Sequence, residues 1–147
     1  MIFVNRIKSD CQTIADSLDV PLENIVGLAA EESEWGRGRI AREYNNYFSM
    51  HAPAPLETDE KPARADPKVK VAVFDTFLQS GKSFAQRYGQ QVKGQKDPKE
   101  FAQALVRCRF NSGDDKTGGR HDFVGYLTGI ISDAKARLEC PVPDAKK

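Results

Sequence analysis

The stretch AAEESEWGRGRIAREYNNYFSMHA, residues 29–52, holds the densest group of side chains that could do chemistry. Three carboxylates, Glu31, Glu32 and Glu34, stand at the end of an apolar run and are followed by glycines, arginines, two asparagines and aromatic residues. A carboxylic acid at the edge of an apolar helix can serve as a general acid if burial keeps it protonated near neutral pH. The chemistry therefore depends on which glutamate faces inward.

Helical periodicity separates the three glutamates. On a wheel of about 100° per residue, one side collects the apolar residues Leu22, Ile25, Val26, Leu28 and Ala29. Glu32 falls about 50° from the centre of that side, whereas Glu31 and Glu34 fall roughly 150° away. We expect Glu32 to point toward the core with a raised pKa, and Glu31 and Glu34 to point outward. The alternative is a partly exposed glutamate at a fraying helix end.

The remaining pattern predicts a mostly helical chain with one extended excursion. Helices are expected at 3–18 and from 22 to about 35, the second ended by glycines at 36 and 38. The proline-rich segment 52–67 excludes a regular helix, and the alternation at 68–74 indicates a strand. Its nearest partner is 56–60, through a turn at 61–67, so we expect a small β-hairpin or an irregular extended lip.

Helices resume after this excursion. We expect a short helix at 75–80 that Gly81 interrupts, then helices at 82–91, at 99–108 with Asp97 as its cap, and at 121–138. The loop at 111–120 and the tail from Cys140 are expected to be flexible or frayed. There is no internal repeat, so the whole chain, 1–147, is expected to form a single domain.

Composition excludes several classes. The net charge of +1 argues against a dedicated nucleic-acid binder, and no apolar stretch is long enough to span a membrane. The N-terminal residues lack the apolar core of a signal peptide, so we expect the chain to be made in the cytoplasm without a secretory signal. Ser80-Gly81-Lys82-Ser83 lacks the earlier glycine of a phosphate-binding loop, because position 76 is threonine.

Cysteines and histidines give no metal pattern. Cys11, Cys108 and Cys140 allow at most one internal disulfide, and Cys11–Cys140 would close the longest loop. Three free thiols are the equal alternative. His51 and His121 lie 70 residues apart, which is not a ligand spacing. We expect neither a metal nor an organic cofactor.

Two linked motifs carry a family resemblance. Residues 30–36, AEESEWG, and 45–52, NNYFSMHA, are similar to the A-L-E-S-x-W-G and N-N-x-F-x-I-K-A motifs of peptidoglycan-cleaving glucosaminidases. This family includes flagellar rod-cap hydrolases and autolysins, and weaker similarity extends over about residues 20–135. The resemblance implies a lysozyme-like α+β fold and places the family's catalytic glutamate on Glu32.

The resemblance also implies a reaction. It predicts hydrolysis of the β-1,4 glycosidic bond after N-acetylglucosamine in peptidoglycan glycan strands, with Glu32 as the acid. The family often carries a second carboxylate in its hairpin, and here Glu57 and Glu60 are both candidates. The family's tyrosine before the last helix is replaced by Phe110, so its role is absent or is supplied by Tyr44, Tyr47 or Tyr126.

Substrate contacts are expected from the two motifs. The candidates are Trp35, Tyr44, Asn45, Asn46, Tyr47 and His51. We expect Tyr47 to line a cleft and Phe48 to fill the core. The asparagine amides could bond a sugar N-acetyl group, although turn formation is the structural alternative. His51 could equally be an ordinary surface histidine.

Three other functions stay open. The chain could be a phage-type endolysin, or a muramidase, or a lytic transglycosylase, which works with one acid, or a glycan-binding module without activity. We favour an antibacterial effector delivered by a type VI-like secretion machine into the periplasm of a target bacterium. Such a protein endangers its producer, so a cognate immunity protein is the expected partner. We expect no binding to nucleic acid and no insertion into a membrane.

Overall fold

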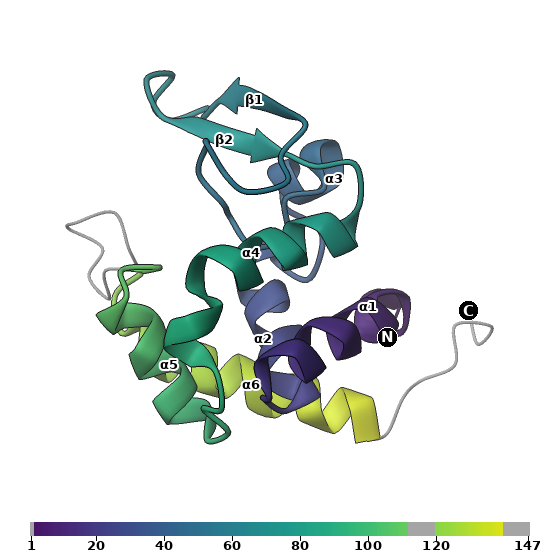
Figure 1. Ribbon diagram of the computed structural model, residues 1–147. Helices are drawn as coiled ribbons and strands as arrows, with labels where there is room; N and C mark the ends of the chain where they lie inside the picture. Colours follow the sequence, from purple (N-terminus) through teal and green to yellow (C-terminus); the bar gives the residue numbers. More distant parts are fainter. Residues whose placement is uncertain (1, 112–119, 140–147) are drawn as a thin grey trace.

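The computed structural model describes residues 2–111 and 120–139. Helices α1 (Ile2–Leu18), α2 (Leu22–Ser33), α5 (Pro98–Arg107) and α6 (Phe123–Glu139) form a helical lobe (Figure 1). The short α3 (Arg39–Tyr44) and the strands β1 (Asp59–Pro62) and β2 (Lys70–Val73) form a smaller lobe, and α4 (Phe77–Val92) runs between the two. The predicted class, predominantly helical with a small β-hairpin, is confirmed.

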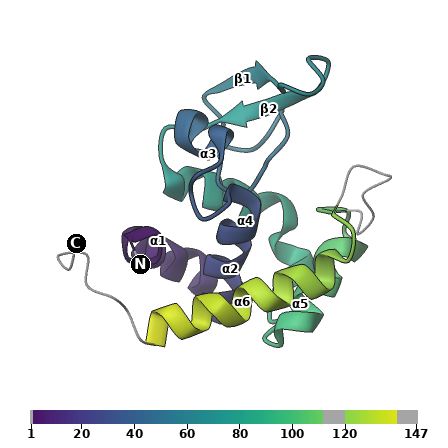
Figure 2. The same cartoon turned by 180° about the vertical axis from the view of Figure 1, so that it is seen from behind.

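Helix α2 is the central element of the helical lobe. It packs against α1 and α6, and α6 crosses it, as seen from behind in Figure 2. Gly27 permits the close approach, since a Cβ there would lie 2.5 Å from Cγ1 of Ile131. The core includes the fully buried aromatic residues Phe48, Phe74, Phe84, Phe101 and Phe123.

The hairpin lies close to its expected place. Strands β1 and β2 are antiparallel, with Asp59 opposite Val73 and Pro62 opposite Lys70. On the other edge of β2, the Ala72 amide donates to the Met50 carbonyl at 3.1 Å, which ties the second motif to the sheet. Compared with the expectation, β1 is shifted toward the C-terminus by two to three residues.

Helix α4 corrects a prediction. Gly81 was expected to break it, but α4 is continuous from Phe77 to Val92, with the Thr76 hydroxyl accepting from the Gln79 amide at its start. A Cβ on Gly81 would meet Cγ1 of Ile14 at 3.1 Å, so this glycine serves the packing of α4 on α1. The Asp97 cap of α5 is confirmed, because its carboxylate accepts from the Glu100 amide at 3.1 Å.

The Cys11–Cys140 disulfide, weakly favoured because it would close the longest loop, is not formed. Cys11 is a free thiol, fully buried in the core, and Cys108 is also free. Cys140 lies outside the described residues, as do the tail that follows it and most of the loop expected at 111–120.

Candidate active site

Glu32 occupies the last turn of α2, where the chain reverses sharply. Three successive residues, Glu34, Trp35 and Gly36, have left-handed φ values of 53°, 57° and 83°. The Gly36 amide donates to the Ser33 hydroxyl at 2.9 Å, and a Cβ on Gly36 would collide with the Phe3 ring, so only glycine fits. The helix therefore ends at Ser33 rather than Trp35, and this turn fixes Glu32 at its end.

The inward orientation of Glu32 agrees with its electrostatics. Burial raises the pKa of its carboxyl group from 4.5 to about 7, while the neighbouring Ser49 side chain lowers it. The charge of Glu31 raises this pKa and that of Arg120 lowers it. The residue as a whole is nevertheless partly exposed at the surface. An acid with a pKa near 7 is half protonated at neutral pH, which suits proton donation.

Ser49 connects Glu32 to the second motif. Its hydroxyl donates to the Glu32 backbone carbonyl at 3.2 Å, and its own φ is 52°. Non-glycine residues adopt this conformation rarely. The sequence contained Ser49 inside the motif but gave no reason to single it out.

Glu31 does not point outward, which corrects the prediction made from the helical wheel. Its side chain is only 7% exposed, and its Oε2 lies 2.5 Å from Nε of Arg120. Burial raises the pKa of Glu31, and the Arg120 guanidinium opposes that rise. The helical-wheel prediction used one helix alone, so it could not include Arg120, which lies 89 positions later in the sequence. Glu34 is exposed, as expected.

The two asparagines hold the backbone together. The Asn46 side chain is fully buried: its amide nitrogen donates to the carbonyls of Met50 and Ala72, both at 2.9 Å, and its oxygen accepts from the Met50 amide. Asn45 donates to the carbonyls of Phe74 and Asp75 and caps α3 in a left-handed conformation. The side-chain amide nitrogens of both asparagines thus donate to backbone carbonyls of the protein, which is a structural role and not a contact with sugar.

The aromatic candidates are also mostly internal. Tyr47 is only 8% exposed and packs against the rings of Phe3 and Phe77, so most of its side chain fills the core, and Phe48 is buried as predicted. Trp35 packs edge-on against Phe3, and the Arg137 guanidinium lies 3.9 Å from its ring centroid.

Tyr44 is engaged in a local contact as well. Its hydroxyl accepts from Nη1 of Arg39 at 3.0 Å, and the same guanidinium lies over its ring. Phe110, at the place of the family's tyrosine, contacts Phe84, Tyr88 and Phe123.

The small lobe carries the two other candidate carboxylates side by side. A hydrogen bond with Glu57 raises the pKa of Glu60, and Oε1 of Glu57 accepts from the Ala54 amide at 2.8 Å. Both therefore lie in one acidic patch, with Glu57 the more firmly held of the two.

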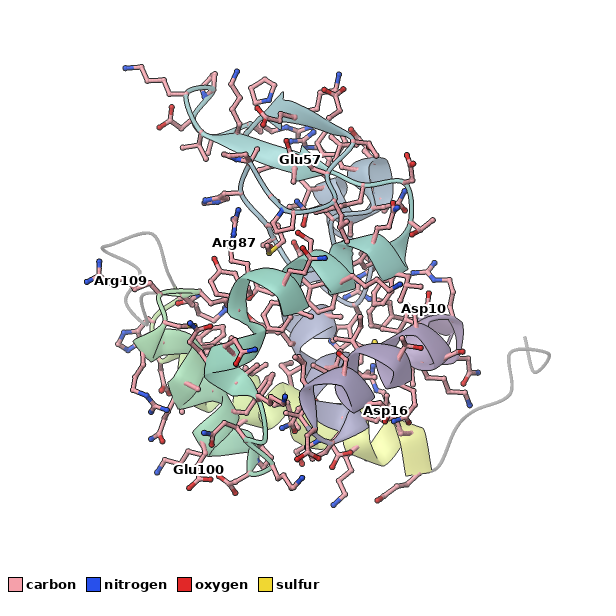
Figure 3. The ribbon with its side chains drawn as sticks, viewed as in Figure 1. Asp10, Asp16, Glu57, Arg87, Glu100 and Arg109 are labelled. Carbon is pink, nitrogen blue, oxygen red and sulfur yellow. The ribbon has the colours of Figure 1, made fainter. Side chains whose placement is uncertain are left out.

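Arg87 supports this lobe from α4. Figure 3 shows Arg87 and Glu57 on the same side of the molecule, with Arg87 below the lobe that carries Glu57. Its guanidinium donates to the carbonyls of His51 and Pro53. His51 itself is exposed beside β2, where it pairs with Val71.

The described parts of the chain offer neither a metal site nor a membrane span. Within residues 2–111 and 120–139, no three or more His, Cys, Asp or Glu side chains gather in a way that could hold a metal ion. None of the helices found there has the length and apolar character that a membrane span requires.

Comparison with known proteins identifies the relatives of this site. A family model for glucosaminidases, described as mannosyl-glycoprotein endo-beta-N-acetylglucosaminidase, matches residues 8–135. A chain in a type VI secretion system effector–immunity complex from Pseudomonas protegens is 52% identical, with a TM-score of 0.85 over 95% of this chain and 93% of that one. The comparison with curated proteins gave no match.

More distant structures share the fold. A peptidoglycan hydrolase from Sphingomonas sp. A1 is 23% identical, with a TM-score of 0.79 over 99% of this chain and 97% of that one. The glycoside hydrolase domain of FlgJ from Salmonella typhimurium is also 23% identical, with a TM-score of 0.67 over 93% of this chain and 89% of that one.

Proposed function

The chain belongs to the glucosaminidase family of glycoside hydrolases, and we propose that it hydrolyses β-1,4 glycosidic bonds of peptidoglycan glycan strands. The observation that carries this proposal is the raised pKa of Glu32. Its carboxyl group lies at the end of the buried helix α2, and its pKa is raised to about 7. The peptidoglycan hydrolase from Sphingomonas sp. A1, which shares this fold, supports the choice of substrate.

In the proposed reaction, Glu32 protonates the oxygen of the leaving sugar as positive charge develops on the ring left behind. The backbone turn at residues 34–36 and the Ser49 hydroxyl hold the acid in position. Glu57 or Glu60 then activates water or stabilises the oxocarbenium-like charge. Glu57 is the stronger candidate, because its contact with the Ala54 amide orients it.

The relative from Pseudomonas protegens supports a biological role. We infer that this protein is an antibacterial effector that acts in the periplasm of a target cell, and that an immunity protein protects the producer. The immunity protein would cover the surface near Glu32 and the extended lip at 52–67. An interface of roughly 800 Å² per partner would be sufficient to block the site.

Product analysis of purified peptidoglycan tests the reaction. After digestion, borohydride reduction should convert new reducing ends to glucosaminitol, as expected for cleavage after N-acetylglucosamine, and Glu32→Gln should give none. Muramitol would indicate a muramidase instead. Anhydro ends would indicate a lytic transglycosylase, and the absence of products would indicate a binding module.

A further inference from the structure

The Glu31–Arg120 pair is an unusual neighbour for an acid. Glu31 stands where the motif that this stretch resembles has leucine, so the chain places a second carboxylate directly beside Glu32. Its side chain is almost completely enclosed, and such a charge is costly unless a cation accompanies it. Arg120 provides that cation from a segment far away in the sequence.

Arg120 is held by three separate contacts. Its Nε donates to Oε2 of Glu31 at 2.5 Å, and its guanidinium lies 4.6 Å from the ring centroid of Tyr126 on α6. Its backbone amide donates to Oδ1 of Asn111 at 3.2 Å. The cation is therefore fixed in place beside the end of α2.

We propose that Glu31 and Arg120 are a positioning pair for Glu32: Glu31 pairs with the arginine and so limits the pull of the guanidinium charge on the proton that burial keeps on Glu32. This inference rests on the proposed function, because it assigns the pair to the same acid. It concerns positioning residues that act through Glu32 and need not touch the substrate.

The charged and polar groups that face Glu32 come from three places. Glu31 lies on the same helix, Arg120 precedes α6, and Ser49 belongs to the second motif. Glu31 favours the neutral acid, whereas Arg120 and Ser49 favour the carboxylate. Removing either member of the pair must therefore shift the titration of Glu32, and the two shifts must have opposite signs.

The test is a carboxyl titration by ¹³C NMR on the full chain labelled in glutamate. The Glu32 signal is assigned by its loss in Glu32→Gln. In Glu31→Gln, Arg120 is left without its partner, so the Glu32 midpoint should fall by at least about 0.5 pH unit. In Arg120→Gln, two carboxyl groups share the site without a cation, so the last proton should leave at a higher pH.

The activity profile should follow the titration. The alkaline limb of kcat/KM should move to lower pH in Glu31→Gln and to higher pH in Arg120→Gln. Glu34→Gln is the matched control, because it removes an exposed carboxylate from the same turn and should move neither measurement. Glu31→Leu and Arg120→Met carry the same predictions if a glutamine variant does not fold.

Shifts of equal sign, or a Glu32 midpoint that does not move, would overturn the pairing role. A loss of activity at all pH values without a shift of the limb would also overturn it, since that result indicates only structural damage. Because the NMR titration needs no catalysis, it separates this inference from the reaction itself. Hydrolysis that persists in Glu32→Gln would remove the proposed function instead.

Discussion

At the scale of single residues, the raised pKa of Glu32 suits it to donate a proton but lowers the stability of the fold at neutral pH. An acid whose pKa is higher in the folded state binds a proton that the unfolded chain has already released. The contribution of Glu32 to stability is thus most favourable below pH 4.5 and declines as the pH rises to about 7. With a rise from 4.5 to about 7, the full cost above neutrality is roughly 3 kcal/mol.

Glu32→Gln should reveal this cost. The variant should lose wall hydrolysis, yet its free energy of unfolding relative to the wild type should increase between pH 4 and pH 8, by up to roughly 3 kcal/mol. Urea unfolding at several pH values measures it, with Glu34→Gln as the control. A difference that does not vary with pH would show that folding does not raise the pKa of Glu32.

The carboxylates of the small lobe should differ from each other. Glu57→Gln should reduce kcat more than Glu60→Gln, because the contact with Ala54 orients only Glu57. Steady-state rates on soluble glycan fragments compare them. If both variants keep full activity, the mechanism does not use this pair, and Asp59, Asp66 or a substrate-assisted route must replace it.

The direction of a side chain could be predicted from the sequence where a single helix determines it. The inward direction of Glu32 follows from the apolar side of α2 alone. The burial of the Glu31 side chain could not be predicted in this way, because its partner Arg120 belongs to another segment. The functions expected of Asn45 and Asn46 were uncertain for a similar reason, since the carbonyls that they bind belong partly to β2 and the residues after it.

At the scale of elements, Asn46 joins α3, the second motif and β2. Asn46→Asp keeps the shape but removes the donors to the Met50 and Ala72 carbonyls and places a charge beside them. We expect a loss of about 3 kcal/mol or more in the free energy of unfolding. Denaturant unfolding and hydrogen exchange of the hairpin measure it. A change below about 1 kcal/mol would contradict the central role of this amide.

The contact between α2 and α6 depends on a missing side chain. Gly27→Ala would place a Cβ 2.8 Å from Cα of Ile131, so the helices must move apart, and we expect a loss of about 1–3 kcal/mol. Gly129→Ala is the matched control on α6: nothing lies within 4 Å of its Cβ, and it should gain up to about 1 kcal/mol from helix propensity. Thermal unfolding compares the two, and equal effects would contradict the packing.

The glycines also show what an element-level prediction lacks. Gly81 was expected to interrupt a helix, because glycine disfavours helices in isolation. In the folded chain, the close contact of α4 with Ile14 outweighs that preference. By contrast, the strand at 70–73 and the Asp97 cap depend on local patterns, and both were predicted nearly in place.

At the scale of the whole molecule, the protein consists of two lobes that α4 joins, and each lobe carries one part of the proposed site (Figure 1). Glu32 belongs to the helical lobe and the acidic patch of Glu57 and Glu60 to the hairpin lobe. Arg87 of α4 binds the segment between Met50 and the patch through two backbone carbonyls. The relative position of the lobes therefore depends on contacts that α4 makes with the small lobe.

Toxicity is the prediction that belongs to the whole molecule. With an added export signal, the protein should reach the periplasm of a Gram-negative host and lyse it, because the proposed substrate lies outside the cytoplasmic membrane. Expression without that signal should be harmless, and Glu32→Gln should be harmless in both compartments. Turbidity and microscopy of induced cultures measure the effect. Co-expression of a cognate immunity protein in the periplasm should restore growth, and equal toxicity from the cytoplasm would rule out peptidoglycan as the target.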